Sequence, residues 1–207
     1  NYDGSLPSII VNGSVFLDDL DHPLAGVSVS ISPANPADGW SCGHGNTDGN
    51  GNFGGAVSKD IPLKLEINWW GGPCSSQIIY SAQIGPFASD VTLPPIIISG
   101  QNLETLTISG RLVDCNGQPL ANGYAKVGIG FYNNFVFSDA NGEFEYISIV
   151  CPGSSDNSGA ITGYDLTNLL ESPPTPFAFP PYTLNVGDIS VCNALSEYIR
   201  YSLDGSP

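Results

Sequence analysis

Apolar and polar residues alternate along several short stretches of this chain. In 27–32, valine or isoleucine at each odd position alternates with serine, and in 127–131 Val, Ile and Phe alternate with glycine. A period of two predicts strands with one buried face. The one stretch with helical character, 162–172, is stopped by Pro173 and Pro174, which cannot continue a helix. The pattern therefore predicts an all-β protein.

The same order of elements occurs twice. "VNGSVFLDDLDHPLAGVSVSIS" starts at Val11, and "ISGRLVDCNGQPLANGYAKVGIG" starts at Ile108. Each copy predicts a strand, a turn with Pro-Leu-Ala, two strands, a D-x-x-G-x-F turn and two further strands. An internal repeat of this length predicts two similar domains, and 207 residues are enough for both.

The predicted architecture is a pair of tandem antiparallel β-sandwiches. The junction is expected near 94–106, where an apolar strand gives way to a polar connector. We therefore expect a first domain over 1–98, a second over 99–195, and a further segment or terminal strand over 196–207.

The segments "ISGRLVDCNGQPLANGYAKV" and "FSDANGEFEY" resemble the carboxypeptidase regulatory-like domain, and the first half resembles it more loosely. This resemblance implies Ig-like, prealbumin-like sandwiches of seven strands. It also implies a non-catalytic accessory module for surface display, adhesion or docking. The closing "VGDISVCNALSEYIRYSLDG" is similar to the junction of bacterial surface lipoproteins, where another domain usually follows.

Charge and composition narrow the choice of partners. Acidic residues outnumber basic ones 20 to 5, giving a net charge of −15 that repels nucleic acid and anionic membranes. No stretch approaches the roughly 18 apolar residues of a membrane span, so direct membrane insertion is not expected. The chain contains no methionine and no signal peptide, which is expected of a mature protein or a fragment. No cofactor is expected.

Five cysteines without a C-x-x-C pair favour an oxidising compartment over a zinc or redox site. The expected location is extracellular or on the outer-membrane surface. In a prealbumin-like sandwich the first and last strands run parallel, so the resemblance implies a disulfide between Cys115 and Cys192. Cys42 and Cys74 would then join loops of the first domain. Cys151 is the candidate free thiol, although pairing of Cys151 with Cys192 stays open.

Two loops invite a calcium hypothesis, "TDGNGNF" from Thr47 and "SDANGEF" from Ser138. An EF-hand loop requires Gly at its sixth position and Glu at its twelfth. Counted from Asp48, those positions hold Phe53 and Lys59, and the second copy fails in the same way. The pattern instead predicts hairpin turns, in which Asp caps the backbone and Gly supplies a positive φ.

A run of carboxylates offers a second, weaker metal candidate. Asp18, Asp19 and Asp21 lie in one loop, but the sequence identifies no further ligand. A solvated turn before Pro23 is favoured over a metal site.

Catalytic chemistry is not indicated. The two histidines, His22 and His44, lie in loops, and no G-x-S-x-G motif occurs. The acidic residues are scattered without a sign of the cleft that glycoside hydrolysis needs. We expect no enzyme activity.

One strand suggests a carbohydrate platform. In 63–70 the alternation places Trp69 on the apolar face and Trp70 on the other, beside Glu66 and Asn68. Trp40, in the predicted loop 37–44, could be a second aromatic residue of this platform. The competing interpretation is that Trp70 packs under a neighbouring loop or the second domain.

Taken together, the sequence predicts a non-catalytic extracellular structural module: a spacer, adhesion or assembly module of a cell-surface protein. Its expected partners are other domains or subunits of a surface assembly. One alternative is a carbohydrate-binding module that uses Trp70, with glycans as partners. Another is a subunit of an extracellular filament joined by strand exchange, with 198–203 as the unpaired strand.

Overall fold

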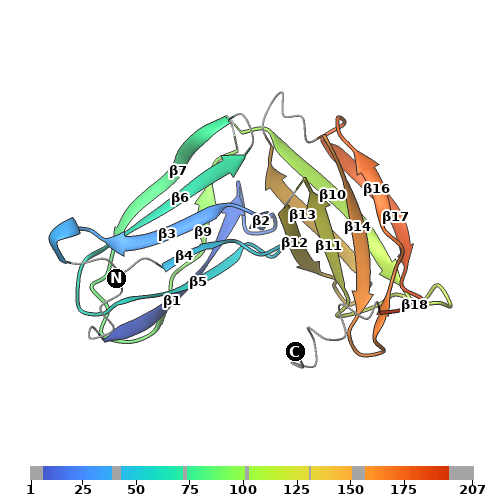
Figure 1. Ribbon diagram of the computed structural model, residues 1–207, viewed down its shortest axis with the longest axis horizontal. Coiled ribbons are helices and arrows are strands. Elements are labelled where there is room, and N and C mark those ends of the chain that lie inside the picture. The colour runs from blue at the N-terminus through green and yellow to red at the C-terminus, as the bar shows by residue number, and fades with distance from the viewer. Residues whose placement is uncertain are drawn as a thin grey trace. The chain divides into compact units, whose positions relative to one another are not determined.

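The computed structural model describes residues 7–38, 43–71, 74–100, 103–130, 132–150 and 157–195. Nearly all regular structure is β, as expected, with one short 3-10 turn, η1 (Pro36–Asp38) (Figure 1). Contacts divide the chain into two compact units. Unit 1 holds the described residues up to Leu106 and those from Ile147 to Val150, and unit 2 holds the others.

Unit 1 is built from two sheets. One has the order β5-β1-β8, with β9 also paired to β1, and the other has the order β4-β3-β6-β7. The strands are β1 (Ser8–Leu17), β2 (Leu24–Ala25), β3 (Ser28–Pro33), β4 (Gly43–Asn46), β5 (Asn52–Ser58), β6 (Leu63–Gly71), β7 (Cys74–Ile84), β8 (Val91–Thr92) and β9 (Ile96–Ile98).

The inner faces of these two sheets form one hydrophobic core. Val11 and Val15 from β1 pack with Leu65 and Ile67 from β6, and all four are fully buried. The predicted alternation in 27–32 is confirmed, because its valines and isoleucine are at most 2% exposed. Unit 1 is therefore a β-sandwich, and every second residue of these strands contributes its side chain to the core between the sheets.

The end of one later strand completes this core. β13 (Glu143–Ile149) begins in unit 2, but Ile147 and Ile149 belong to the unit 1 cluster. Ile147 pairs in parallel with Leu24 of β2, and the indole Nε1 of Trp69 donates to the carbonyl of Ile149 at 3.1 Å. The chain therefore returns to unit 1 after it has entered unit 2.

Unit 2 also contains two sheets. β17, β10 and β13 are neighbours in one, while the other has the order β12-β11-β14-β15-β18, with β16 paired to β14. The strands are β10 (Thr105–Val113), β11 (Tyr124–Ile129), β12 (Tyr132–Phe137), β14 (Ser158–Asp165), β15 (Leu170–Glu171), β16 (Thr175–Ala178), β17 (Thr183–Ser190) and β18 (Asn193–Ala194).

The two sheets of unit 2 meet through buried side chains and one close glycine. Ile108 and Leu112 of β10 and Val127 of β11 are fully buried. A Cβ added at Gly163 of β14 would lie 2.9 Å from Leu112 Cδ2 and from Val191 Cγ2. The missing side chain lets the sheets approach each other here.

The stretch with helical character, 162–172, forms the end of β14, a turn and β15. Asp165 Oδ1 accepts hydrogen bonds from the backbone N–H groups of Thr167 and Asn168, and Leu169 has a φ of 55°. An Asp-capped turn is thus favoured over a helix.

A disulfide joins Cys115 and Cys192, as the family resemblance implied. Cys115 follows β10 and Cys192 follows β17, so the bond lies beyond the ends of two strands that run parallel. Cys42 and Cys151 lie outside the described residues, and of Cys74 only the backbone is described. The Cys42–Cys74 bond and the free thiol at Cys151 stay predictions.

Candidate functional site

The predicted carbohydrate platform lies on β6. Trp69 is 9% exposed and belongs to the core, as predicted from the alternation. Glu66 and Asn68 are half-buried, and the Nζ of Lys64 lies 2.6 Å from Glu66 Oε1. Trp40 and the side chain of Trp70 lie outside the described residues, so the platform itself stays a prediction.

Two of the three carboxylates in the acidic loop, those of Asp18 and Asp19, bind groups of the protein. Asp18 Oδ1 accepts a hydrogen bond from the backbone N–H of Gly100 at 2.8 Å. Asp19 Oδ1 accepts one from the N–H of Asp21 at 2.9 Å and lies 2.6 Å from His22 Nδ1. The Asp21 bond, with a smaller contribution from His22, lowers the pKa of Asp19. The described residues contain no group of three His, Cys, Asp or Glu placed to share a metal ion.

The two calcium-like loops form the predicted turns. Asp48 Oδ1 accepts hydrogen bonds from the N–H groups of Asn50 and Asn52 at 2.9 and 2.8 Å. Asp139 repeats the arrangement at 2.8 Å for both bonds, with positive φ at Gly142. The carboxylates are thereby used to shape the backbone, which confirms the turn interpretation.

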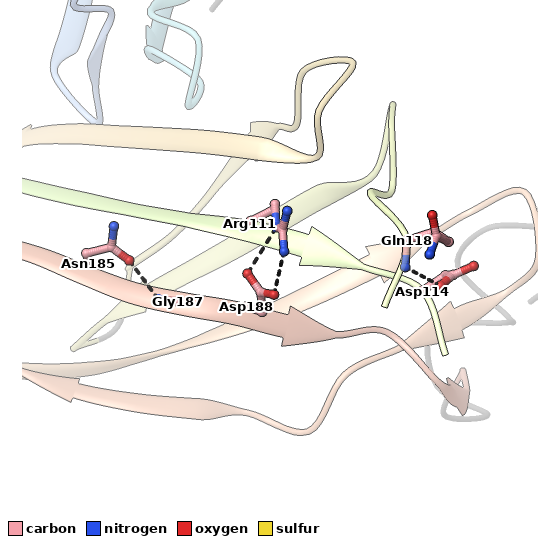
Figure 2. Close-up of polar contacts among 6 residues, drawn as sticks. All are labelled: Arg111, Asp114, Gln118, Asn185, Gly187 and Asp188. Carbon is pink, nitrogen blue, oxygen red and sulfur yellow. Dashed lines mark hydrogen bonds and ion pairs between the residues drawn. The ribbon is translucent and has the colours of Figure 1, made fainter. Parts of the chain in front are cut away.

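A third turn of the same design follows β10. Asp114 Oδ1 accepts a hydrogen bond of 2.8 Å from the N–H of Gln118 (Figure 2). It accepts a second one, also of 2.8 Å, from the N–H of Asn116. These two bonds, the Gln118 bond most, lower the pKa of Asp114. All three turns have the sequence pattern D-x-N-G, so the turn at Asp114 could also be predicted from the sequence.

An open groove of about 600 Å³ lies on the outward face of β10, β13 and β17 in unit 2. Its polar lining comes from the three strands and from the turn before β13: Ser109, Arg111, Asp139, Glu143, Glu145, Asn185 and Asp188. Among the described lining residues Arg111 is the single cation, and carboxylates outnumber it. The groove therefore disfavours anionic ligands. The groove was not predicted from the sequence, because its lining residues are far apart along the chain.

Arg111 and Asp188, both in the lining of the groove, form a bidentate ion pair between β10 and β17 (Figure 2). Arg111 Nε lies 3.0 Å from Asp188 Oδ1, and Nη2 lies 2.7 Å from Oδ2. A shift of register between Ser109 and Arg111 aligns them, where Gly187 has a φ of 71°. The hydrogen bonds from the guanidinium lower the pKa of Asp188 and raise that of Arg111. The pair ties β10 to β17.

The third notable surface is the free edge of β7 in unit 1. β7 pairs with β6, and within the described ranges no strand pairs with its other edge. The segment 77–84 carries no charged residue, and Ile78 is 55% exposed. An apolar pocket of about 320 Å³ adjoins this edge, lined in part by Tyr80, Ile84 and Leu93. Such an edge is able to pair with a further strand.

In the described ranges, no helix is long and apolar enough to span a membrane.

No family model matches this chain, and no curated protein sequence matches it. Among solved structures, the shaft pilin SpaA from Lactobacillus rhamnosus GG is 14% identical, with a TM-score of 0.32 over 91% of this chain and 98% of that one. The minor pilin GBS52 from Streptococcus agalactiae is 11% identical, with a TM-score of 0.35 over 91% and 97%. A 9R-lipoxygenase from Cyanothece is 18% identical, with a TM-score of 0.34 over 44% and 16%. Because these TM-scores are low, the function of the chain is inferred from its own structure.

Proposed function

We propose that this chain is a non-catalytic structural module of an extracellular, cell-surface assembly, where it serves as a load-bearing spacer. In this proposal, 1–98 and 99–195 are tandem carboxypeptidase regulatory-like sandwiches of the prealbumin type. The segment 196–207 begins a further segment or forms a terminal strand. The partners are other domains or subunits of the same assembly.

The supporting observation is that the first strand of each unit pairs in parallel with a later strand of that unit. β1 pairs in parallel with β9, through Val15 with Ile96 and Leu17 with Ile98. β10 pairs in parallel with β17 from Thr107 to Val113. The Arg111–Asp188 ion pair and the Cys115–Cys192 disulfide reinforce the second pairing.

The parallel pairing determines how each unit responds to a pulling force. Without a disulfide, a pull between the start of the first strand and the end of its parallel partner shears the ladder between them. In unit 2 the Cys115–Cys192 bond carries this pull past the ladder until it is reduced. Hydrogen bonds that lie across the strands are then loaded together, instead of one after another as in an unzipping hairpin. A parallel terminal pair suits a module that transmits force along its chain.

The extracellular part of the proposal is tested on native protein. Intact source cells are treated with a thiol-blocking reagent and a membrane-impermeant biotin label, and the protein is then digested without reduction. We expect a Cys115–Cys192 linked peptide and surface biotin on the same molecules. Blocked, unpaired Cys115 and Cys192 in unlabelled protein would place the chain in a reducing compartment and contradict the proposal.

A second candidate, a subunit joined by strand exchange, is favoured by the free edge of β7. An extended segment such as 198–203 of another copy would add to this edge, with an apolar side chain in the adjoining pocket. Light scattering distinguishes the candidates. Strand exchange predicts a polymer that Ser81→Lys dissociates and Ser81→Ala does not, because a charge on an edge strand opposes pairing. Monomers in every case exclude it.

A further inference from the structure

Four aromatic residues gather on one outward sheet face of unit 2. Tyr124 of β11 lies directly opposite Phe137 of β12 on one side and Tyr164 of β14 on the other. Phe135 lies two positions before Phe137 and points to the same face. We call Tyr124, Phe135, Phe137 and Tyr164 the aromatic surface.

The rings of the aromatic surface support one another. Tyr124 stacks on Tyr164 with ring centroids 4.8 Å apart and an interplanar angle of 20°. Phe135 and Phe137 meet Tyr124 edge-on, at 5.5 and 6.3 Å. Tyr164 is 3% exposed, whereas Phe135 is 44% and Phe137 57% exposed. Two accessible phenylalanines therefore stand on a base of packed tyrosines, which limits the entropy that they lose on binding a ligand.

The fold itself does not require the two exposed phenylalanine rings. The opposite face of β11 already supplies Ala125 and Val127 to the core, and its neighbour Val136 is 2% exposed. Exposed large apolar groups raise the risk of association, so a cluster of them usually marks a binding surface.

Polar groups border the aromatic surface. Lys126 lies directly opposite Phe135, and Asn133 occupies the next outward position along β12. Glu171 pairs with Tyr164. Burial and, next, the negative charge of Glu171 raise the pKa of both Tyr124 and Tyr164.

We propose that the aromatic surface binds a neutral saccharide chain. A pyranose ring has an apolar C–H face that packs on an aromatic ring, and a rim of hydroxyls that both donate and accept. Phe135 and Phe137 offer the rings, Lys126 and Asn133 offer donors, and Glu171 offers an acceptor. This site is separate from Trp70 and does not depend on the spacer function.

Charge and size favour this ligand over others. The charges of Lys126 and Glu171 cancel, and the chain as a whole has a net charge of −15. Acidic saccharides and nucleic acid are therefore repelled. A stable protein interface buries about 800 Å² on each partner, more than a site centred on two exposed rings provides. A saccharide chain needs only a few such contacts.

The test is a calorimetric titration of the whole chain with neutral hexasaccharides of glucose, xylose and mannose, and with an oligogalacturonate. We expect at least one neutral sugar to bind and the oligogalacturonate not to bind. Phe137→Ala should weaken binding about tenfold or more, as the loss of one stacking contact does for other flat ligands. Phe137→Tyr, which keeps the ring, should retain most of the affinity.

Ile97→Ala is the matched control, because Ile97 is a large apolar residue of unit 1 with 49% exposure. It should leave the affinity unchanged, and circular dichroism should show that all variants stay folded. The proposal is overturned if no neutral sugar binds, if the Phe135→Ala, Phe137→Ala double variant binds as well as the parent, or if the oligogalacturonate binds best. Self-association that Phe137→Ala abolishes, without sugar binding, would assign the surface to a protein contact instead.

Discussion

At the scale of single residues, three D-x-N-G turns carry much of the local order. In each turn, the Asp carboxylate accepts two backbone N–H groups and the glycine has a φ of 76° or 77°. Two of these glycines also lie against backbone of another segment. A Cβ at Gly51 would collide with the carbonyl of Val15, and one at Gly142 would collide with that of Leu112. A Cβ added at Gly117 would have no other residue within 4 Å apart from its two chain neighbours.

This difference predicts that Gly→Ala lowers the free energy of unfolding by unequal amounts at these positions. Gly117→Ala should lower the free energy of unfolding by about 1–2 kcal/mol, because it meets only the strain of a left-handed backbone. Gly142→Ala should cost about 3 kcal/mol or more, since displacement of the Leu112 carbonyl adds to that strain. Urea denaturation of the two variants measures both values. Equal costs would show that the close approach at Gly142 has no energetic effect.

The Arg111–Asp188 pair predicts a dependence on acid. The pKa of Asp188 is lowered in the folded state, so its stabilising contribution is present above the unfolded pKa of about 3.9 and is lost as the pH falls through the folded value. The free energy of unfolding should therefore decline below about pH 4. Asp188→Asn and Arg111→Gln should each make that decline shallower. Urea titrations over a pH series check this, and unchanged slopes in both variants would argue against the pair.

At the scale of elements, the period of two predicted the strands well, because it reports which face of each strand is buried. Val27, Val29 and Ile31 confirm this. The same pattern does not report which core a strand enters. In β13 the buried positions change from Phe144 and Tyr146 to Ile147 and Ile149, so the phase of the alternation shifts by one residue where the strand passes from unit 2 to unit 1. The aromatic surface was missed for a related reason, because its members lie on three strands and meet only through their register.

The return of β13 predicts a long-range effect on stability. Ile149→Ala should destabilise unit 1 by about 2–5 kcal/mol, as expected for loss of a buried isoleucine side chain. All three tryptophans lie in the first half of the sequence, so their fluorescence reports the unfolding of that half. We expect the fluorescence-detected transition to shift for Ile149→Ala and to change by no more than about 0.5 kcal/mol for Ile97→Ala. If Ile149→Ala shifted the unfolding transition seen by another probe but left the fluorescence-detected transition unchanged, the assignment of Ile149 to unit 1 would be contradicted.

At the scale of the molecule, each unit pairs its first strand in parallel with a later strand, and a disulfide secures the second pair. Cysteine spacing alone left several pairings open, and only the family resemblance pointed to Cys115 with Cys192. The bond closes a loop with a sequence separation of 77 residues. Closing a loop of this length should contribute about 4 kcal/mol, which Cys115→Ser, Cys192→Ser should remove in thermal or urea unfolding.

The load-bearing claim is tested most directly by stretching a single chain tethered at its two ends, before and after reduction. With the disulfide intact, the residues between Cys115 and Cys192 cannot extend. After reduction, the fully stretched chain should lengthen by roughly 250–280 Å more, since 77 residues extend about 3.3–3.6 Å each. Abrupt, separate rupture events with this added length in reduced chains would support the account. Gradual lengthening at low force, or the same final length in both states, would contradict it.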